Sequence, residues 1–220
     1  MAASCFHVNT NFTAGDGGNK TLVKGEGPTV TRSYDLAGFD AVHVNGQGDV
    51  EFIQSEGYSV TLASQENVFE YIDMRLDGST LVFEVKKGYN VRAKDLDLTL
   101  CAPSLKEVKV NGSADFDIPA GLSVDGDVSF KVNGAGDLDL KSVRCATLSL
   151  AVNGAADISA SDIDVSELKV LVNGAGDATI SGRTVDADFQ VNGAGDIDAR
   201  GLEVSGHASK RASGFAKIRL

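Results

Sequence analysis

The sequence of 220 residues has no tryptophan, three prolines and only three histidines. His7, His43 and His207 are isolated from one another, so they do not suggest a zinc site or histidine-based catalysis. No glycine-rich phosphate loop and no serine in a nucleophile-elbow context occurs. No apolar run reaches the roughly 18 residues of a membrane-spanning helix. The net charge of −11 argues against binding to nucleic acid or to acidic membranes.

Cysteine is also scarce, and the three cysteines lie in different contexts. Cys101 and Cys145 occupy alternating strand positions and are expected as small buried residues, too far apart for a disulfide. Cys5 follows Met1-Ala2-Ala3-Ser4, which resembles the small-residue end of a bacterial lipoprotein signal. On that interpretation Cys5 carries a lipid, and the alternative is an incidental cysteine in a leader. We expect residues 1–30 to form a flexible leader or tether.

Glycine is plentiful, with 25 residues, and many of these glycines belong to one recurring turn. The first copy reads Val44-Asn45-Gly46-Gln47-Gly48-Asp49, and later copies keep the pattern Asn-Gly-x-Gly/Ala-Asp. After a gap of 66 residues, successive asparagines are 22, 20, 20 and 19 residues apart. Such a period indicates a stack of equivalent coils. The motif asparagines are Asn45, Asn111, Asn133, Asn153, Asn173 and Asn192.

Each coil contains three short stretches in which apolar residues alternate with polar ones. In residues 147–166 the apolar positions are Leu148, Leu150, Val152, then Ile158, Ala160, then Ile163, Val165. About 20 residues at about 3.3 Å each give a perimeter of roughly 66 Å, which leaves no room for a helix. The sequence therefore predicts an all-β fold: a single-stranded, right-handed parallel β-helix with three short strands and about 20 residues per coil.

The turn motif assigns a structural role to each of its positions. A glycine after every asparagine suggests a positive φ, at Gly46, Gly112, Gly134, Gly154, Gly174 and Gly193. The second small position of the motif holds either glycine or alanine. We therefore expect that it has space only for a small side chain and that it does not require a positive φ. The stacked asparagines are expected to form a ladder of amide hydrogen bonds.

The aspartates of the motif form a column in which like charges repel one another. Their carboxylates must therefore face water, accept turn N–H groups, or hold a cation. Turn capping is favoured, structural calcium is the weaker alternative, and no other cofactor or metal is expected. These residues are Asp49, Asp115, Asp137, Asp157, Asp177 and Asp196.

The gap between Asn45 and Asn111 interrupts the repeat within a single domain. We assign residues 31–220 to the β-helix, with irregular N-terminal coils at about 54–103 and regular coils at about 104–220. Residues 57–63 and 80–86 still alternate as strands, Asn67–Ile72 suggests a helical turn, and Asp77-Gly78-Ser79 suggests a tight turn. This stretch could form broader coils or a sheet-like cap. At the other end, basic residues are interpreted as edge protection rather than an anion site: Lys210, Arg211, Lys217 and Arg219.

Three features together carry a resemblance to a known family: residues 36–46, residues 100–105 and the Asn-Gly-x-Gly/Ala-Asp repeats. Over Thr31 to Leu220 the chain resembles the putative auto-transporter adhesin, head GIN domain family, common among Bacteroidetes. The resemblance implies an exported single-stranded β-helix. Fold alone does not establish an activity.

We therefore expect a non-catalytic, exported cell-envelope protein, an adhesin or surface binding module. It would lie in the periplasm or at the outer membrane or cell surface, with a lipid anchor if Cys5 is the acceptor. Its partner would be a glycan or an envelope protein, and not nucleic acid. The alternatives are a carbohydrate-active enzyme, lyase-like or hydrolase-like, and a structural spacer. A cleft with two or three convergent carboxylates and a basic residue would favour the enzyme. A smooth face without such a cleft would favour the binding module. The break in the repeat, between Gln54 and Pro103, is where we expect function.

Overall fold

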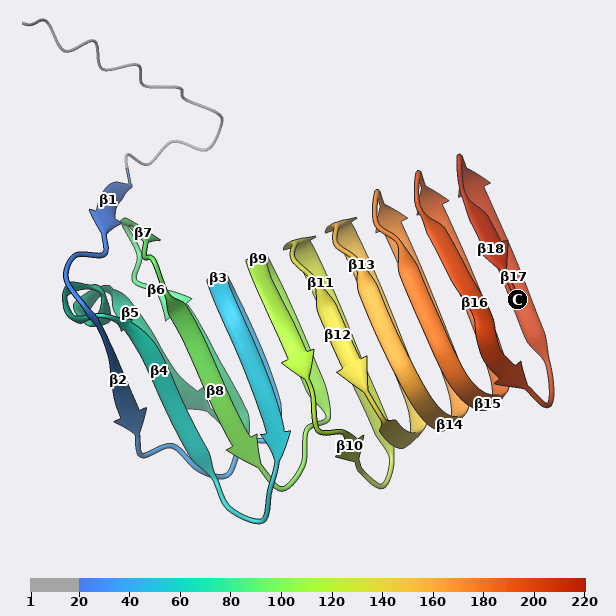
Figure 1. The fold of residues 1–220 in the computed structure, drawn as a ribbon, viewed down its shortest axis with the longest axis horizontal. Helices are drawn as coiled ribbons and strands as arrows, with labels where there is room; N and C mark the ends of the chain where they lie inside the picture. Colours follow the sequence, from blue (N-terminus) through green and yellow to red (C-terminus); the bar gives the residue numbers. More distant parts are fainter. Residues whose placement is uncertain (1–19) are drawn as a thin grey trace, which may run out of the picture.

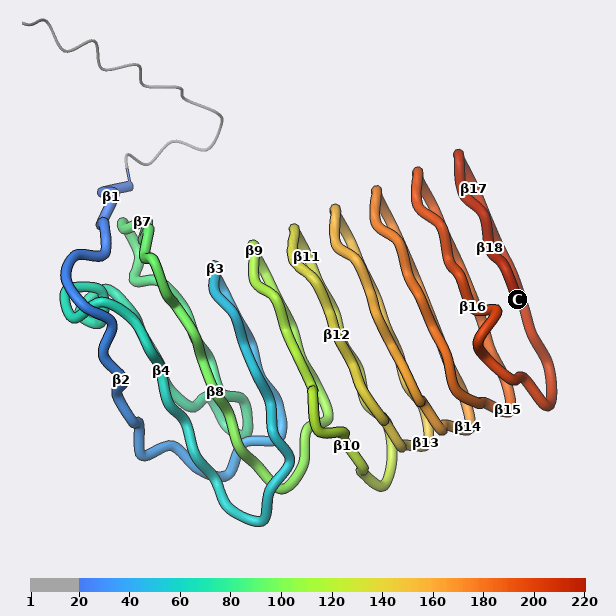
Figure 2. Tube along the Cα trace, viewed as in Figure 1, coloured from blue at the N-terminus to red at the C-terminus, as the bar shows by residue number. Residues whose placement is uncertain are grey.

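The computed structural model describes residues 20–220, which form parallel β-coils stacked along one long axis (Figure 1). This is a β-solenoid of about 5 turns with about 21 residues per turn, so the predicted all-β coil fold is confirmed. The tube trace shows the coils as flattened rings lying side by side (Figure 2). The stack is built from β3 (Ala41–Gln54), β9 (Glu107–Ile118), β10 (Leu122–Ser123), β11 (Asp127–Ala135), β12 (Leu138–Lys141), β13 (Val143–Ala155), β14 (Ile158–Gly174), β15 (Ala178–Gly193), β16 (Asp196–Val204), β17 (Ala208–Gly214) and β18 (Lys217–Arg219).

The three inward stretches of a coil are joined into longer strands than the sequence suggested. Strands β14 and β15 run for 17 and 16 residues, because the chain bends without losing its ladder to the next coil. Burial still divides β14 into three groups. The register with β15 shifts between Ala160 and Ile163, which marks one of the bends.

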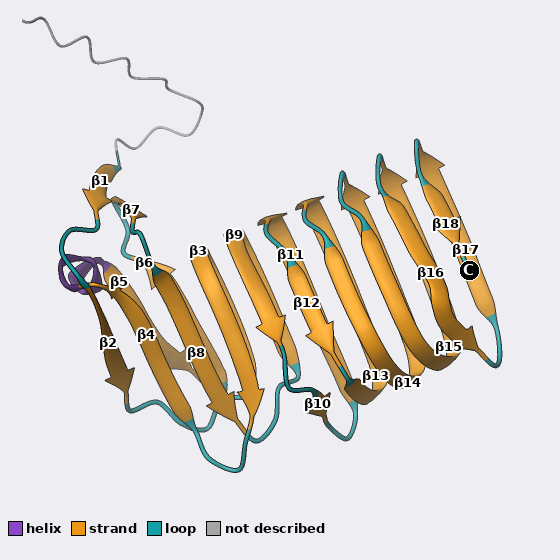
Figure 3. Cartoon of the chain, viewed as in Figure 1, coloured by secondary structure: helices purple, strands orange, loops and turns teal. Residues whose placement is uncertain are grey.

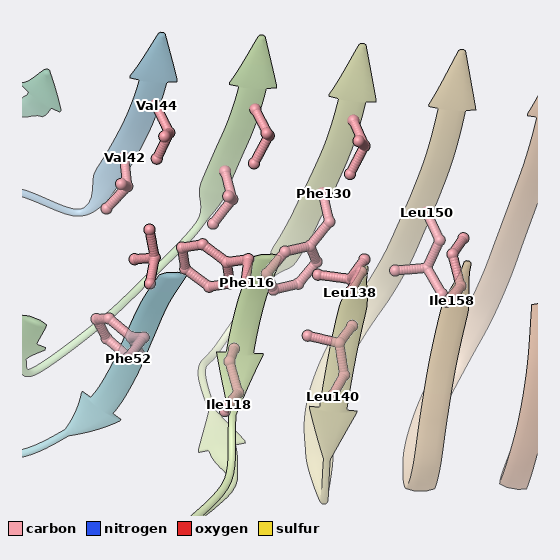
Figure 4. Packing of buried hydrophobic residues seen from close by; sticks show 14 of the residues in the cluster. Val42, Val44, Phe52, Phe116, Ile118, Phe130, Leu138, Leu140, Leu150 and Ile158 are labelled. Carbon is pink, nitrogen blue, oxygen red and sulfur yellow. The ribbon is translucent and has the colours of Figure 1, made fainter. Parts of the chain in front are cut away.

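The inward residues of successive coils stack into a single hydrophobic core. Parallel registers bring Val44, Val110 and Val132 together, and all three are buried. Figure 4 shows Phe52, Phe116 and Phe130 lying between the two sides of the coils. The rings of Phe116 and Phe130 are 6.1 Å apart, centre to centre. Burying such a side chain stabilises the fold by about 1.5–3 kcal/mol, so the columns hold the coils together.

The interruption of the repeat forms a cap rather than a set of inserted coils. Strand β3 pairs directly with β9, so the first two motif coils are neighbours despite the 66 residues between their asparagines. The intervening chain covers the other edge of β3, where β6 (Thr80–Val85) and β8 (Leu96–Ala102) pair with β3 in parallel. This innermost layer resembles a coil.

The outer layer of the cap is antiparallel. Strand β4 (Ser59–Gln65) pairs with β8, β2 (Thr29–Tyr34) pairs with β4, and β5 (Ile72–Asp77) pairs with β6. A 3₁₀ helix, η1 (Glu66–Tyr71), is the purple element in Figure 3, close to the helical turn expected at residues 67–72. Gly78 and Ser79 form the tight turn between β5 and β6. The structure thus combines the two arrangements left open for this stretch.

Strands begin earlier than the domain boundary expected at residue 31. Strand β1 (Thr21–Lys24) pairs in parallel with β7 (Tyr89–Arg92), and β2 begins at Thr29. Part of the proposed leader therefore belongs to the fold. Cys5 and the rest of residues 1–19 lie outside the described residues. None of the helices within residues 20–220 is long and apolar enough to cross a membrane.

The two strand cysteines are less buried than the sequence suggested. Cys101 and Cys145 are free thiols of intermediate exposure. Cys101 faces outward on β8, between the buried Leu100 and Ala102, whereas Cys145 packs against the core but is only partly buried. Burial of the Cys145 sulfur, followed by the charge of Asp127, raises the pKa of the thiol to about 11. Such a thiol is protonated at neutral pH and is a poor nucleophile.

Candidate functional site

The motif asparagines form a continuous ladder along one edge of the coils. From Asn111 onward, the side-chain Nδ2 of each asparagine donates to Oδ1 of the preceding one at 2.8–3.0 Å. At the cap, Nδ2 of Asn45 donates to Glu84 at 3.4 Å, and at the far end Ser213 takes the next place in the register. Each interior side-chain amide thus donates one hydrogen bond to one neighbour and accepts one from the other, which is a structural role.

From Gly112 to Gly193, the glycine after each motif asparagine is required both by backbone angle and by space, whereas a Cβ atom at Gly46 would meet only Val85, at 3.6 Å. At Gly112, Gly134 and Gly154, φ lies between 141° and 149°. A Cβ atom there would lie 1.9–2.0 Å from the carbonyl oxygen of the preceding rung. The second small position is less uniform than expected, since Gly48 and Gly136 do have positive φ, at 134° and 131°.

The aspartates of the motif cap the turns of the coils that follow them. Oδ1 of Asp115 accepts the backbone N–H of Asp137 at 2.8 Å, and the pattern continues to Asp196, which accepts the N–H of Lys217 at 2.9 Å. Lys217 and Arg219 then end the acidic column, with Arg219 3.1 Å from Asp196. Within residues 20–220, no three His, Cys, Asp or Glu side chains are arranged to hold a metal ion.

A second row of acids lies beside the first three coils, and sequence reasoning did not single it out. Glu51, Asp117 and Asp139 are register partners on β3, β9 and β12, each two residues beyond the aspartate column. Burial, followed by the charge of Asp139, raises the pKa of Asp117 above its usual value. Burial and the charges of Asp115 and Asp97 likewise raise the pKa of Asp49. Strand alternation places these acids on the same outward face.

This acidic face is hollowed where the cap joins the coils. One hollow of about 430 Å³ combines carboxylates with hydroxyl groups, and its polar lining residues are Thr31, Asp49, Glu51, Thr61, Asp97, Thr99 and Asp117. A hollow of about 270 Å³ shares Glu51 and Asp117 and adds Asp139 and Lys141. The hydroxyl groups come from cap strands whose pairing the sequence does not reveal. Together we call these two hollows the acidic hollow.

A third depression, of about 320 Å³, lies on the other side of the first motif turn, at residues 45–49. Its charged side chains are positive, unlike those of the acidic hollow. It lies between the motif turns of β3 and β9 and the segment that joins β6 to β7. Its lysines are Lys20, Lys86 and Lys87, and no carboxylate of residues 20–220 lines it. We call it the lysine pocket. The sequence does not reveal this pocket, because Lys20 and Lys86 are distant in the chain and neither lies in the repeat.

Comparisons with known proteins agree with this architecture. Residues 38–220 match the family described as "Putative auto-transporter adhesin, head GIN domain". None of the curated proteins matches the chain.

Solved structures of similar fold include proteins from Parabacteroides and Bacteroides species. The chain is similar to a putative adhesin from Parabacteroides distasonis, with 24% identity and a TM-score of 0.81 over 90% of this chain and 84% of that one. A putative adhesin from Bacteroides fragilis shares 19% identity, with a TM-score of 0.74 over 90% and 99% of the two chains. A putative lipid binding protein from P. distasonis shares 20% identity, with a TM-score of 0.79 over 91% and 100%. The family match shows that this chain belongs to the putative auto-transporter adhesin, head GIN domain family.

Proposed function

We propose that this protein is a non-catalytic, exported module of the cell envelope that binds glycans at the acidic hollow. The observation that carries the proposal is the meeting of hydroxyl and carboxylate groups on one face. Thr61 and Thr99 are register partners on β4 and β8, and the next strands of the same sheet bring Glu51 and Asp117. Such groups accept and donate hydrogen bonds to sugar hydroxyls.

The rigidity of the solenoid supports a binding role. The acidic hollow lies on paired strands rather than on loops, and side chains on such elements lose less conformational freedom on binding. Family membership supports adhesion and export. Attachment through Cys5 is part of this proposal, and labelled fatty acid should be incorporated into the native chain in cells but not into Cys5→Ser.

Glycan-array binding tests the proposal directly. The native protein should bind at least one neutral glycan, and Thr61→Val with Thr99→Val should weaken that binding about tenfold, since two hydrogen bonds are lost. Thr179→Val is the matched control, because Thr179 is an exposed threonine on β15, away from the acidic hollow. Removal of calcium should leave binding unchanged, because turn N–H groups already occupy Oδ1 atoms of the aspartate column. If the native protein binds no glycan, the spacer role becomes the better account.

One observation favours a second candidate, a carbohydrate-active enzyme. Glu51, Asp117 and Asp139 lie on three consecutive rungs and Lys141 lines the same hollow, which is the combination expected of an enzyme. Rungs are about 4.8 Å apart, close to the roughly 5 Å between the two carboxyl groups of retaining glycosidases. An acid with a raised pKa, as at Asp117, suits the general acid of such a pair.

Product analysis separates the two candidates. An enzyme would release new reducing ends or unsaturated sugars from a polysaccharide, and Asp117→Asn would abolish release while leaving binding intact. Binding by the native protein without any release would establish the module.

A further inference from the structure

The lysine pocket is built from a turn and a strand that are fixed to each other. The N–H of Tyr89 donates to the carbonyl oxygen of Lys86 at 3.1 Å, and Gly88 has a φ of 91°, so Lys86 to Tyr89 form a β-turn. The N–H of Thr21 donates to the carbonyl oxygen of Gly88 at 2.9 Å. This bond brings Lys20, just before β1, to the turn that carries the other two lysines. Figure 1 shows β1 and β7 side by side, projecting from the cap.

Among the described residues, no carboxylate forms an ion pair with the ammonium groups of the pocket. The Nζ atom of Lys86 donates to the carbonyl oxygen of Glu70 at 2.7 Å, which holds its side chain in place. Across residues 20–220, none of the three lysines forms an ion pair, although the chain as a whole carries a net charge of −11. Three cations in one concave site, none of them in an ion pair with a described residue, favour an anionic ligand.

The remaining walls of the pocket carry sugar-binding chemistry. Gln47, Asn90 and Ser113 supply amide and hydroxyl groups. The Tyr89 ring is 36% exposed and is held against Tyr71, with ring centres 4.7 Å apart. A fixed, half-exposed aromatic ring gives the apolar face of a sugar ring a surface to stack on, and the neighbouring amides can bond its hydroxyl groups. The volume of about 320 Å³ suits one sugar unit rather than a long chain.

We infer that the lysine pocket binds a negatively charged sugar unit, carrying a carboxylate or a sulfate group. The three ammonium groups hold the anion, the Tyr89 ring stacks on the sugar, and the polar side chains fix its orientation. This site is separate from the acidic hollow, so the inference does not depend on the proposed function. A chain with two such sites could hold an acidic glycan at one place and a neutral one at another.

Titration with defined sugars tests the inference. Glucuronate and galacturonate oligomers represent the carboxylated source, and sulfated galactose oligomers represent the sulfated one. Unsubstituted galactose oligomers and inorganic sulfate are the neutral and non-sugar controls. At least one acidic series should bind saturably and more weakly as salt is added, and the neutral series should not bind at this site. The series that binds identifies the anion.

Charge reversal then locates the site. Lys20→Glu with Lys87→Glu should weaken binding at least tenfold. Lys131→Glu with Lys210→Glu makes the same change in net charge on β11 and β17, and should leave the affinity within about twofold. Tyr89→Leu should weaken the sugar but not the residual binding of inorganic sulfate. Thermal melts check that each variant is folded.

Three results would overturn the inference. The first is that neither acidic series binds, whatever the neutral glycans do at the acidic hollow. The second is an equal loss in both charge-reversal pairs, which would show general electrostatic attraction. The third is that inorganic sulfate binds as tightly as the sugars, which would show an anion site without sugar recognition. Variants of Thr61 and Thr99 should leave this binding unchanged, so failure here and failure of the proposed function are distinguishable.

Discussion

At Gly154, φ is 149° and an added Cβ atom would lie 2.0 Å from the carbonyl oxygen of Gly134. Gly154→Ala must therefore strain the backbone and push two rungs apart, and we expect the free energy of unfolding to fall by about 2–4 kcal/mol. Urea denaturation measures this change. Gly57→Ala is the control, since nothing lies within 4 Å of its Cβ position and its φ is not positive. It should be neutral or slightly stabilising. Equal effects at both sites would contradict the steric argument.

The carboxyl group of Asp117 makes the free energy of unfolding depend on pH in the direction opposite to ordinary acid denaturation. The pKa of Asp117 is raised in the folded state, mainly by burial and then by Asp139, so its deprotonation costs the fold stability. That contribution is fully present below the usual aspartate pKa near 4 and is lost as pH rises through the raised value.

Asp117→Asn should therefore stabilise the protein at pH 7 by about 0.5 kcal/mol, a small gain because the carboxyl group is only partly removed from water and solvent screens its charge. The advantage should vanish below about pH 4 and shrink in high salt. Chemical denaturation at several pH values measures it. Asp125→Asn is the control, and an equal gain there would assign the effect to net charge alone.

Residue roles in the repeat could be predicted because each position recurs in every coil. A glycine that follows every asparagine implies a backbone requirement, and a stacked amide has few other partners. The role of the aspartate column was harder to predict, since the same spacing fits carboxylates that face water, accept turn N–H groups or hold a cation. The lysine pocket could not be predicted from the sequence, because no periodicity connects Lys20 with Lys86 and their proximity depends on the β1–β7 pairing.

At the scale of elements, the cap shows the limit of pattern reading. Residues 57–63 and 80–86 alternate with a period of two, which predicts strands whether they pair in parallel or antiparallel. The direction depends on where the chain turns, and β4 reverses against β8 while β6 runs parallel to β3. The two longest coil strands, β14 and β15, also merged expected segments, because a bend and a break look alike in sequence.

A cavity made in the cap should loosen the first coil, and a cavity made in a middle coil should loosen the neighbours of that coil. Leu98 on β8 and Leu168 on β14 are both buried, at 1% and 0% exposure, so Leu→Ala at either site should cost about 2–5 kcal/mol. In a stack where each coil contacts only its neighbours, the loosening should stay local. Leu98→Ala should speed amide exchange in β3 and β8, and Leu168→Ala should speed it in β13 and β15. Uniform acceleration in both variants would show instead that the whole stack opens as one unit.

At the scale of the whole molecule, the two ends of the solenoid are finished differently. The N-terminal end is covered by the cap, whereas within residues 20–220 β17 pairs only with β15, and Phe215 beside it is 94% exposed. Strand alternation places Ala208, Lys210 and Ala212 in the inward rows of β17, since they pair in register with Ala187, Phe189 and Val191. Small and charged residues thus replace the apolar ones where the core would otherwise meet water.

Lys210 is the central residue of this arrangement, because it continues the core column of Phe189 but carries a charge. Lys210→Val would extend the apolar column to an open strand edge, and such edges pair with other chains. We expect the variant to self-associate, with an apparent mass in light scattering that at least doubles as protein concentration rises. Lys131→Val is the matched control, because Lys131 faces outward on β11, whose edges are already paired with β9 and β13. If both variants keep the mass of the native chain, the backbone edge is protected by something other than the Lys210 charge, and the neighbouring Lys217 and Arg219 become the residues to reverse next.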